Sequence, residues 1–233
     1  MIYQHRLVIS RGGRLSKRNE VFQGDSMKVI EAHGSVLVGA WEVWIGAEAG
    51  SGVYQIRQFD SLATWEQHQQ RLRDDAEHDD RRLSQLYTLF DFCDTSILRL
   101  NPRSPALPQQ WPSFDAVQGQ PRGVFEQRTI WLRPDGADHH HATYFEKIQP
   151  ALEREGSRVV AFFDTVIGPG TTNGRSHRSI ELRYFPDMGA WQLWREAQDS
   201  DQALRQLTRQ VWPSMIERMD SLLLRPLDYS RIR

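Results

Sequence analysis

The sequence has a single cysteine, Cys93, among its 233 residues. One thiol cannot form a disulfide within the chain, and it excludes zinc and iron–sulfur sites built from several cysteines. No apolar run approaches the roughly 20 residues that cross a bilayer. The N-terminal stretch IYQHRLVI alternates like a strand and does not resemble a signal peptide. These features predict a cytoplasmic protein without a membrane partner.

The chain also lacks an excess of either charge. It holds 29 Lys and Arg against 30 Asp and Glu, with a formal net charge of -1. Nucleic-acid binders usually carry a basic excess, so we expect no nucleic-acid partner. No Gly-x-Gly-x-x-Gly follows a strand, and neither a P-loop nor a Gly-x-Ser-x-Gly elbow is present. The sequence therefore gives no sign of the nucleotide-binding and hydrolase classes that these motifs define.

What the chain does contain is an internal repeat. LVGAWEVWIG (37–46) aligns with VVAFFDTVIG (159–168) at an offset of 168 − 46 = 122. VYQIRQFDSLATW (53–65) aligns with SIELRYFPDMGAW (179–191) at 191 − 65 = 126. A four-residue insertion in the loop IGPGTTNGRSHRS explains the change of offset. A repeat of this length indicates that each half is one folding unit.

The segment between the halves is rich in proline, which stiffens an extended chain and removes backbone donors. We predict a first repeat at 1–101, a semi-rigid linker at 102–122 and a second repeat at 123–233.

Each repeat shows the same order of expected elements. A strand is followed by a helix that stops at Gly34 or Gly156, then by two strands that form a hairpin. Ser61 or Asp187 then caps a helix that we expect to open on Trp65 or Trp191. A last strand ends each repeat, giving the β-α-β-β-α-β order of an α+β, ferredoxin-like fold. The expected strands are 2–9, 36–45, 53–59 and 95–100, and 124–131, 158–167, 179–185 and 221–226.

Apolar residues at helical spacing extend the second helix of each repeat. In the first repeat they are Leu83, Leu86, Tyr87 and Phe90, and in the second they are Leu204, Leu207, Val211 and Met215.

With these elements the sequence resembles the NIPSNAP family of the dimeric α/β-barrel superfamily. The resemblance lies in Glu126 and Arg128, in LVGAWEVWIG and VYQIRQFDSLATW, and in LLLRP at 222–226. It implies two tandem ferredoxin-like units that form a dimeric α/β barrel within one chain, an intrachain pseudo-dimer, with a further homodimer left open. Members of the wider superfamily include cofactor-free oxygenases, haem-degrading enzymes, muconolactone-isomerase-like proteins and stress proteins, so the fold does not settle the function.

Alternating side chains place Glu126 and Arg128 on one face of a strand, and Glu181 and Arg183 on one face of its neighbour. We interpret these four residues as a structural ladder of cross-strand ion pairs. The positions between them on the second strand are apolar, so we expect the ladder on the sheet face away from the helices.

The first repeat has Gln4, Arg6, Gln55 and Arg57 at the same positions. Both arginines remain, but both carboxylates are replaced. Burying a guanidinium group destabilises the fold unless a negative group pairs with it. We therefore predict that Arg6 and Arg57, together with Arg99, bind an anionic substrate group such as a carboxylate or an enolate.

Two residues are candidates for proton transfer. Glu42 lies among apolar strand residues, as does Asp164 in the second repeat, and burial there could raise its pKa. The alternative is that each carboxylate pairs with an arginine, which for Glu42 would be Arg57. His5 lies on the face opposite Arg6, where we expect it to look toward the helices as a general base or as a core histidine.

Trp41, Trp44 and Trp131 do not recur in the other repeat and could line a pocket for a planar ligand. Tyr54 is a further candidate for binding the substrate. His139, His140 and His141 are adjacent and converge poorly on one ion. We therefore expect no metal site, and we interpret these histidines as solvated residues at a helix start.

These features favour a small-molecule enzyme without a cofactor. It would act on an anionic or planar metabolite by proton transfer, isomerisation or oxygenation, as in a tailoring step of biosynthesis, in a pocket of the first repeat. One alternative is a non-catalytic module that binds a small molecule or another protein. Another is a haem-handling relative with His5 as the candidate ligand.

Overall fold

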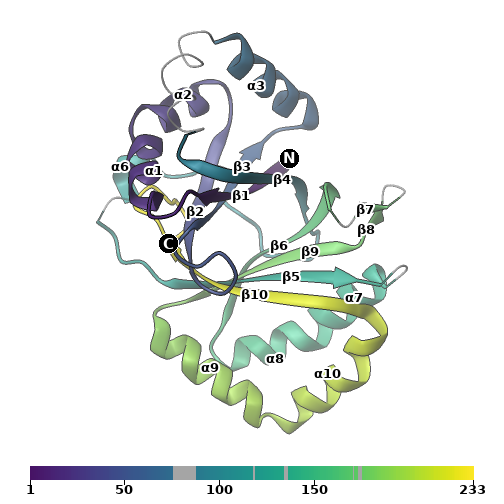
Figure 1. The fold of residues 1–233 in the computed structure, drawn as a ribbon. Coiled ribbons are helices and arrows are strands. Elements are labelled where there is room, and N and C mark those ends of the chain that lie inside the picture. Colours follow the sequence, from purple (N-terminus) through teal and green to yellow (C-terminus); the bar gives the residue numbers. More distant parts are fainter. Residues whose placement is uncertain (76–87, 118, 134–135, 170, 173–174) are drawn as a thin grey trace. The chain divides into compact units, whose positions relative to one another are not determined.

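The computed structural model describes the chain except for residues 76–87, 118, 134–135, 170 and 173–174. The described residues form two compact units (Figure 1). Unit 1 contains residues 1–97, 110–120 and 226–233. Unit 2 contains residues 98–109 and 121–225. Each unit therefore combines most of one repeat with a short segment from elsewhere in the chain.

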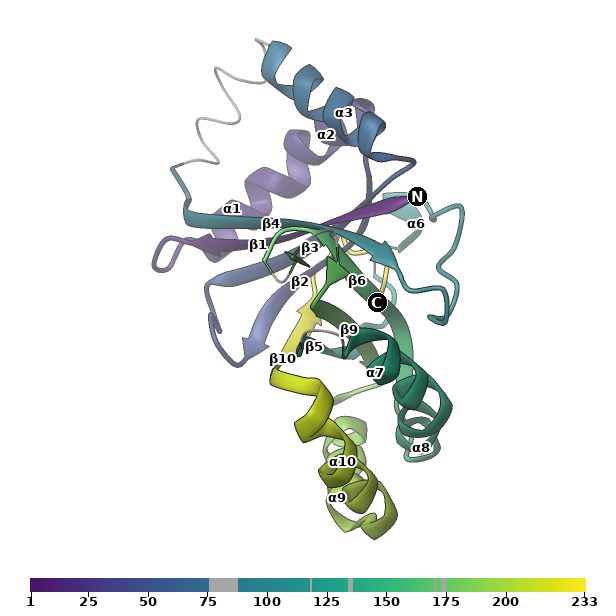
Figure 2. The same cartoon turned by 90° about the vertical axis from the view of Figure 1, so that its right-hand side faces the viewer.

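Unit 1 is a four-stranded sheet with helices on one face (Figures 1 and 2). The strand order is β4-β1-β3-β2, and β3 pairs antiparallel with both β1 and β2. Its elements are β1 (Ile2–Ser10), α1 (Leu15–Val21), η1 (Phe22–Ser26), α2 (Met27–Ala32), β2 (Val36–Ile45), β3 (Gly52–Phe59), α3 (Leu62–Asp74), β4 (Phe90–Leu100, whose last residues belong to unit 2) and the short α6 (Phe114–Val117).

Unit 2 has the corresponding strand order, β10-β5-β9-β6, with helices on one face of its sheet (Figures 1 and 2). The four-residue insertion lies in the loop that carries a small two-stranded ribbon, β7-β8. The elements of unit 2 are β5 (Val124–Leu132), α7 (Ala137–Thr143), η3 (Tyr144–Ile148), α8 (Gln149–Arg154), β6 (Arg158–Ile167), β7 (Thr171–Thr172), β8 (Arg175–Ser176), β9 (Arg178–Phe185), α9 (Met188–Ser200), α10 (Gln202–Met215) and β10 (Ile216–Pro226).

Both units thus have the ferredoxin-like order, and the α+β fold class is confirmed. Gly34 and Gly156 follow the first helical region with φ of 94° and 98°, a conformation that glycine adopts without strain. Ser61 Oγ accepts from the Thr64 N–H, and Asp187 caps the matching helix. The structure corrects the predicted start of these helices, which begin at Leu62 and Met188.

The first helical region of each repeat is interrupted at η1 or η3, which begins at Phe22 or Tyr144. The segment η3 is a π-helical turn, whereas η1 contains a kink at Gly24, whose backbone is not helical. Such turns widen a helix locally and are frequent at functional sites. Phe90 begins β4, so its expected place in a helix was wrong. Leu83, Leu86 and Tyr87 lie outside the described residues.

The core of each unit lies between its sheet and its helices. In unit 1, Phe22 and Ile30 from the helices pack with Leu37 and Val53 from the sheet. Tyr229 joins this core from the C-terminal tail, which bonds to β2 through the Leu227 N–H and the Ala40 carbonyl at 2.9 Å. The tail therefore completes the helix-side core of unit 1.

The predicted linker also packs on the units. Ser104 Oγ accepts from the Phe162 N–H at 2.9 Å in unit 2, and Trp111 Nε1 donates to Gln58 Oε1 at 2.8 Å in unit 1. The boundaries of the linker and the repeats remain a prediction.

Among the described residues, every helix is too short or too polar to cross a bilayer.

Candidate functional site

The charged ladder of unit 2 faces the helices. Arg183 Nη2 donates to the Tyr144 hydroxyl of η3 at 2.7 Å, and the Arg128 guanidinium lies 5.1 Å from the Trp194 ring of α9. The expectation that it faces away from them was wrong. Ile180 and Leu182 on the other face are each 1% exposed, as deeply buried as the charged residues. Apolar character therefore does not distinguish the two faces of this sheet.

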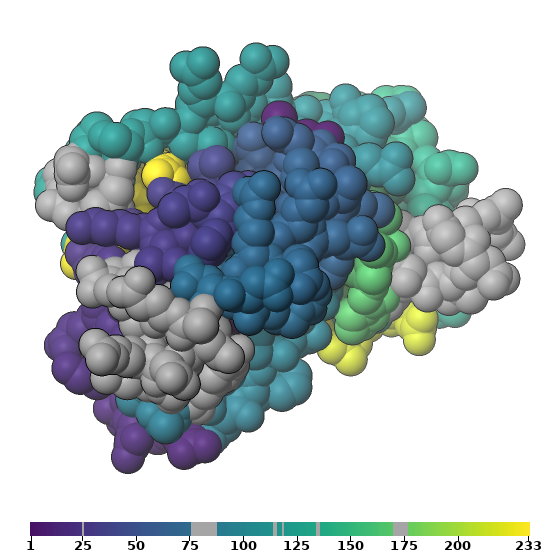
Figure 3. Space-filling model, turned by 90° about the horizontal axis from the view of Figure 1, so that it is seen from above, coloured from purple at the N-terminus to yellow at the C-terminus, as the bar shows by residue number. Residues whose placement is uncertain are grey.

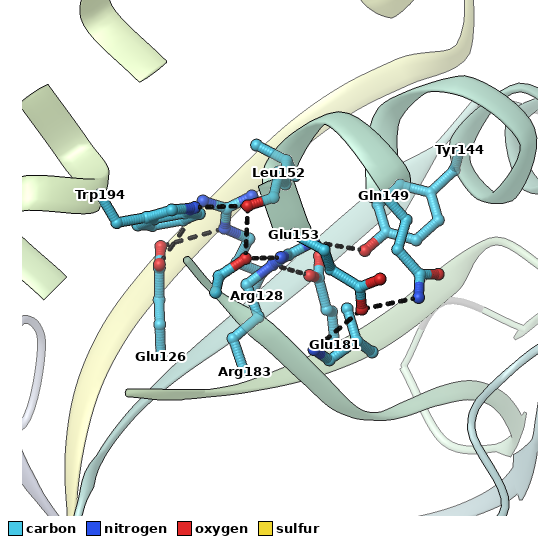
Figure 4. A network of polar contacts seen from close by, with 11 residues as sticks. Glu126, Arg128, Tyr144, Gln149, Leu152, Glu153, Glu181, Arg183 and Trp194 are labelled. Carbon is cyan, nitrogen blue, oxygen red and sulfur yellow. Dashed lines mark hydrogen bonds and ion pairs between the residues drawn. The ribbon is translucent and has the colours of Figure 1, made fainter. Parts of the chain in front are cut away.

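Every charge of the unit 2 ladder has a partner (Figure 4). The register places Glu126 opposite Arg183, and Arg128 opposite Glu181. The ion pairs that form run along each strand: Arg128 Nε lies 3.0 Å from Glu126 Oε1, and Arg183 pairs with Glu181. Arg183 Nη1 also donates to Ser157 Oγ at 2.6 Å. Burial acts against the charge of Arg128, but the Glu126 carboxylate raises its pKa overall.

Unit 1 keeps the arginines of this pattern and lacks its acids. Gln4 pairs with Arg57 in the register of β1 and β3, and Arg6 pairs with Gln55. Arg57 is 1% exposed, and its guanidinium lies 5.6 Å from the Phe22 ring of η1. Like the unit 2 ladder, these residues therefore face the helices.

A third arginine enters this space from α1. Arg18 is 2% exposed and occupies the position that corresponds to His140 (18 + 122 = 140). Arg18 Nη1 donates to the Tyr229 hydroxyl at 3.2 Å and to Asn19 Oδ1 at 2.8 Å, and these acceptors are both neutral. We call Arg6, Arg18 and Arg57 the arginine cluster.

The arginine cluster is electrostatically unbalanced. Burial, then the charges of Arg6 and Arg18, lower the pKa of Arg57 to about 9. Arg57 Nε and Nη2 make no hydrogen bond within the described part of the chain. The charge of Glu31 acts to raise this pKa, but its carboxylate is bound to Arg231, with Nη1 at 2.5 Å from Oε1. Arg57 is therefore a buried cation with free donors.

Arg6 is half-buried at the edge of the arginine cluster. Its Nη2 donates to Cys93 Sγ at 3.1 Å, while its Nε is buried and makes no hydrogen bond among the described residues. The two strand arginines predicted to bind an anion together, Arg6 and Arg57, lie on the same face of the sheet.

Arg99 and Glu42 do not join this group. Arg99 is exposed and belongs to unit 2. Glu42 lies opposite Val53, four residues along β3 from Arg57, so the register does not support its pairing with that arginine. Trp44 is half-buried near the end of β2.

His5, Trp41 and Tyr54 lie on the opposite face of the unit 1 sheet. The His5 and Tyr54 ring centroids are 5.0 Å apart, and Trp41 lies opposite Tyr54 in the register. A Cβ at Gly39 would overlap the Trp41 ring, so this glycine makes room for the indole. The expectation that His5 faces the helices was wrong, because its neighbour Arg6 takes that direction. These residues are therefore separated by the sheet from the arginine cluster.

The histidines of α7 also differ from expectation. His139 is exposed, but His140 is 1% exposed and burial lowers its pKa to about 3. His141 Nε2 lies 3.2 Å from Asp164 Oδ1, so this pair, not an arginine, engages the carboxylate. Asn101 Nδ2 and Ser179 Oγ also donate to Asp164, at 2.7 and 2.9 Å. The network is closed, which is typical of a structural role.

Sequence reasoning missed Arg18, His68 and Tyr229. Arg18 and His68 stand where the second repeat has His140 and Trp194 (68 + 126 = 194), so listing the repeat positions whose chemistry differs could have found both. Tyr229 comes from the tail, and no sequence signal connects it to the arginines.

The fold of the whole chain has relatives among solved structures. An anthrone oxidase-like protein matches with a TM-score of 0.64 and 14% identity, over 97% of this chain and 91% of that chain. A candidate monooxygenase from Fusobacterium nucleatum matches with a TM-score of 0.60 and 10% identity, over 97% and 92%. One from Lactobacillus acidophilus matches with a TM-score of 0.58 and 11% identity, over 96% and 93%. At such identities the similarity shows the fold alone, that of two tandem ferredoxin-like units.

The second repeat matches a known family. The NIPSNAP family model matches residues 125–231. The second repeat is therefore a NIPSNAP domain, as the sequence resemblance implied. A comparison with curated proteins finds no match.

Proposed function

We propose that the protein is a small-molecule enzyme that binds an organic anion at the arginine cluster of unit 1 and transforms it by proton transfer or oxygen insertion. The observation that carries this proposal is Arg57, a fully buried guanidinium whose Nε and Nη2 have no hydrogen-bond partner among the described residues.

The charge of the arginine cluster supports an anionic ligand. After burial, the charges of Arg6 and Arg18 lower the pKa of Arg57, and that of Arg6 lowers the pKa of Arg18. The positions that hold Glu126 and Glu181 in unit 2 are glutamines here. An unpaired buried charge is strongly destabilising, whereas a carboxylate or enolate would accept charge-assisted hydrogen bonds from the guanidinium fork.

The ring of Phe22 favours a planar ligand. It lies 5.1 Å from the Arg18 guanidinium and 5.6 Å from that of Arg57, so an apolar surface adjoins the cationic one. The fold similarity to an anthrone oxidase-like protein and to candidate monooxygenases agrees with chemistry on a planar organic molecule.

Calorimetric titration with benzoate and related aromatic carboxylates tests the binding step. We expect Arg57→Gln to weaken binding by about tenfold to a hundredfold, the effect of about 1.5–3 kcal/mol for hydrogen bonds to a charged group. Arg14→Gln is the matched control, because Arg14 is an exposed arginine one turn before Arg18. Equal affinity of the wild type and Arg57→Gln for every carboxylate would rule the proposal out.

Turnover separates an enzyme from a carrier. Planar enols and phenols that carry a carboxylate are incubated with the protein in air, and substrate loss and oxygen uptake are followed. Arg57-dependent consumption supports the enzyme. Arg57-dependent binding without consumption of any compound supports a non-catalytic small-molecule carrier instead.

A further inference from the structure

His68 of α3 lies on the same side of the unit 1 sheet as the arginine cluster. Its side chain is 1% exposed, and its ring packs edge-on against Phe59 with centroids 5.2 Å apart. Phe59 is two residues after Arg57 on β3, so the two side chains share one face. Helix α3 lies beside α2 on the surface of unit 1 (Figures 2 and 3).

The hydrogen bonds of His68 fix which ring nitrogen is basic. Nδ1 lies 3.2 Å from the His33 carbonyl oxygen, which can only accept, so Nδ1 carries the proton of the neutral ring. Nε2 then presents a lone pair. It is buried and makes no hydrogen bond to any described residue. His68 therefore holds an acceptor without a donor, while Arg57 holds donors without an acceptor.

His68 is neutral at physiological pH. Burial, and after it the Arg57 charge, lower the pKa of His68 to about 4, against the raising effect of the bond to His33. In the neutral ring the Nε2 lone pair can accept a proton or a hydrogen bond from a ligand.

Unit 2 shows what this position contacts. The equivalent residue, Trp194, lies 5.1 Å from the Arg128 guanidinium and 5.6 Å from that of Arg183. Its Nε1 donates to the Leu152 carbonyl at 3.0 Å, and an indole has no acceptor. Replacing the indole by an imidazole in unit 1 supplies a proton acceptor and a smaller ring beside the corresponding pair of arginines.

We propose that His68 Nε2 is the proton acceptor for the ligand that the arginine cluster binds. The site then takes acids that carry an acidic hydrogen near an anionic or carbonyl oxygen, such as enols, phenols or enolisable ketones. In this step the ligand O–H or C–H bond breaks and the proton moves to Nε2. The electron pair stays on the ligand as a phenolate or enolate, whose oxygen accepts from Arg57.

This inference rests on the proposed function, and two matched pairs of probes separate the two proposals. The 3- and 4-hydroxybenzoates have the O–H group, and their methyl ethers lack it. We expect the wild type to bind at least one hydroxybenzoate about tenfold or more tightly than its ether, because a buried acceptor left unpaired is costly. In His68→Phe that preference should disappear, with binding of the ether retained.

The outcomes are distinguishable. If Arg57→Gln weakens binding of all probes while His68→Phe keeps the hydroxyl preference, or the wild type has none, the role of His68 is overturned and the anion site stands. If no probe depends on Arg57, both proposals fall.

Nitrogen-15 NMR of labelled histidine provides a measurement that needs no variant. The wild type should show His68 with Nδ1 protonated and Nε2 unprotonated, and Nε2 should gain a proton or a strong hydrogen bond when the preferred hydroxybenzoate is added. The opposite tautomer in the free protein would overturn the proposal.

Discussion

The helix-side clusters of units 1 and 2 start from the same backbone and the same two strand arginines. In unit 2, Arg183 meets Glu181, Tyr144 and Ser157. In unit 1, the position of Glu181 is Gln55 and the position of Tyr144 is Phe22, yet Arg57 is retained. Unit 2 therefore pairs its buried arginine with a carboxylate, whereas the corresponding arginine of unit 1 has no acid at that position.

The second helix of each unit repeats the contrast. Trp194 in unit 2 fills its place with an indole whose N–H is bonded, while His68 in unit 1 keeps an unbonded ring nitrogen. These two differences lie at one depth of the fold, between sheet and helices. The proposed function therefore places the site in unit 1 and leaves unit 2 as the scaffold, since duplication lets one copy change while the other preserves the fold.

Among the variants that test this comparison, Glu181→Gln should cause the largest loss of stability. It removes the acid that pairs with Arg183 at a position that is 0% exposed, and breaking a buried ion pair costs about 3–5 kcal/mol. The free energy of unfolding from urea denaturation measures the loss. Glu196→Gln on the exposed face of α9 is the control and should change stability by less than about 0.5 kcal/mol. A loss no larger than in the control would show that unit 2 does not need its acids.

Gln55→Glu makes the opposite change in unit 1. A carboxylate beside Arg57 would restore the pattern of unit 2, so we expect the ligand-free protein to gain about 1.5–3 kcal/mol, the range for hydrogen bonds to a charged group. The same variant should lose the stabilisation that benzoate gives the wild type in thermal unfolding. A variant that still responds fully to benzoate would contradict the assignment of Arg57 as the anion-binding group.

Part of this contrast could be predicted from the sequence. Strands and turns followed from alternation and glycine positions, and aligning the repeats showed that Gln4 and Gln55 replace Glu126 and Glu181. Two repeats can be compared residue by residue without knowing which face of a strand each side chain lies on. The unbalanced pair of Arg6 and Arg57 was therefore accessible without coordinates.

The rest depended on tertiary packing. Both faces of the sheets are buried, so apolar character could not tell which face meets the helices, and the ladder and His5 were assigned to the wrong sides. Arg18 comes from a helix and Tyr229 from the tail, and only packing brings them to Arg57. Long-range contacts of this kind leave no periodic signal in a single sequence.

Acid should destabilise the two units over pH ranges that begin together and end at different pH. Burial first, and then nearby positive charge, lower the pKa of His68 to about 4, and burial lowers that of His140 to about 3. The unfolded chain takes up these protons near pH 6.5, the ordinary value, before the folded chain does. The stability that depends on neutral histidine is therefore complete above pH 6.5 and falls as the pH drops toward 4 or 3.

His68→Phe should remove the part of the acid-induced loss of stability that occurs between pH 6.5 and 4. His140→Phe should remove a part that continues toward pH 3. Unfolding midpoints at a series of pH values measure both, and we expect each effect to be smaller than the loss of a buried ion pair. Wild-type and variant curves that stay parallel from pH 6.5 to 4 would contradict the depressed pKa of His68.

Tyr144→Phe should give a smaller effect than Glu181→Gln, because it places the aromatic ring of unit 1 in unit 2 and leaves the carboxylate beside Arg183 in place. Arg183 Nη2 donates to the hydroxyl at 2.7 Å, and losing a hydrogen bond to a charged group costs about 1.5–3 kcal/mol. The double variant with Glu181→Gln then asks whether the cluster acts as one network. Residues that share a partner should couple by about 0.5 kcal/mol or more in a double-mutant cycle, since Arg183 contacts both. Strictly additive losses of stability would mean that Tyr144 and Glu181 stabilise Arg183 independently. The two replacements at these positions in unit 1, Phe22 and Gln55, would then be separate changes and not the loss of one network.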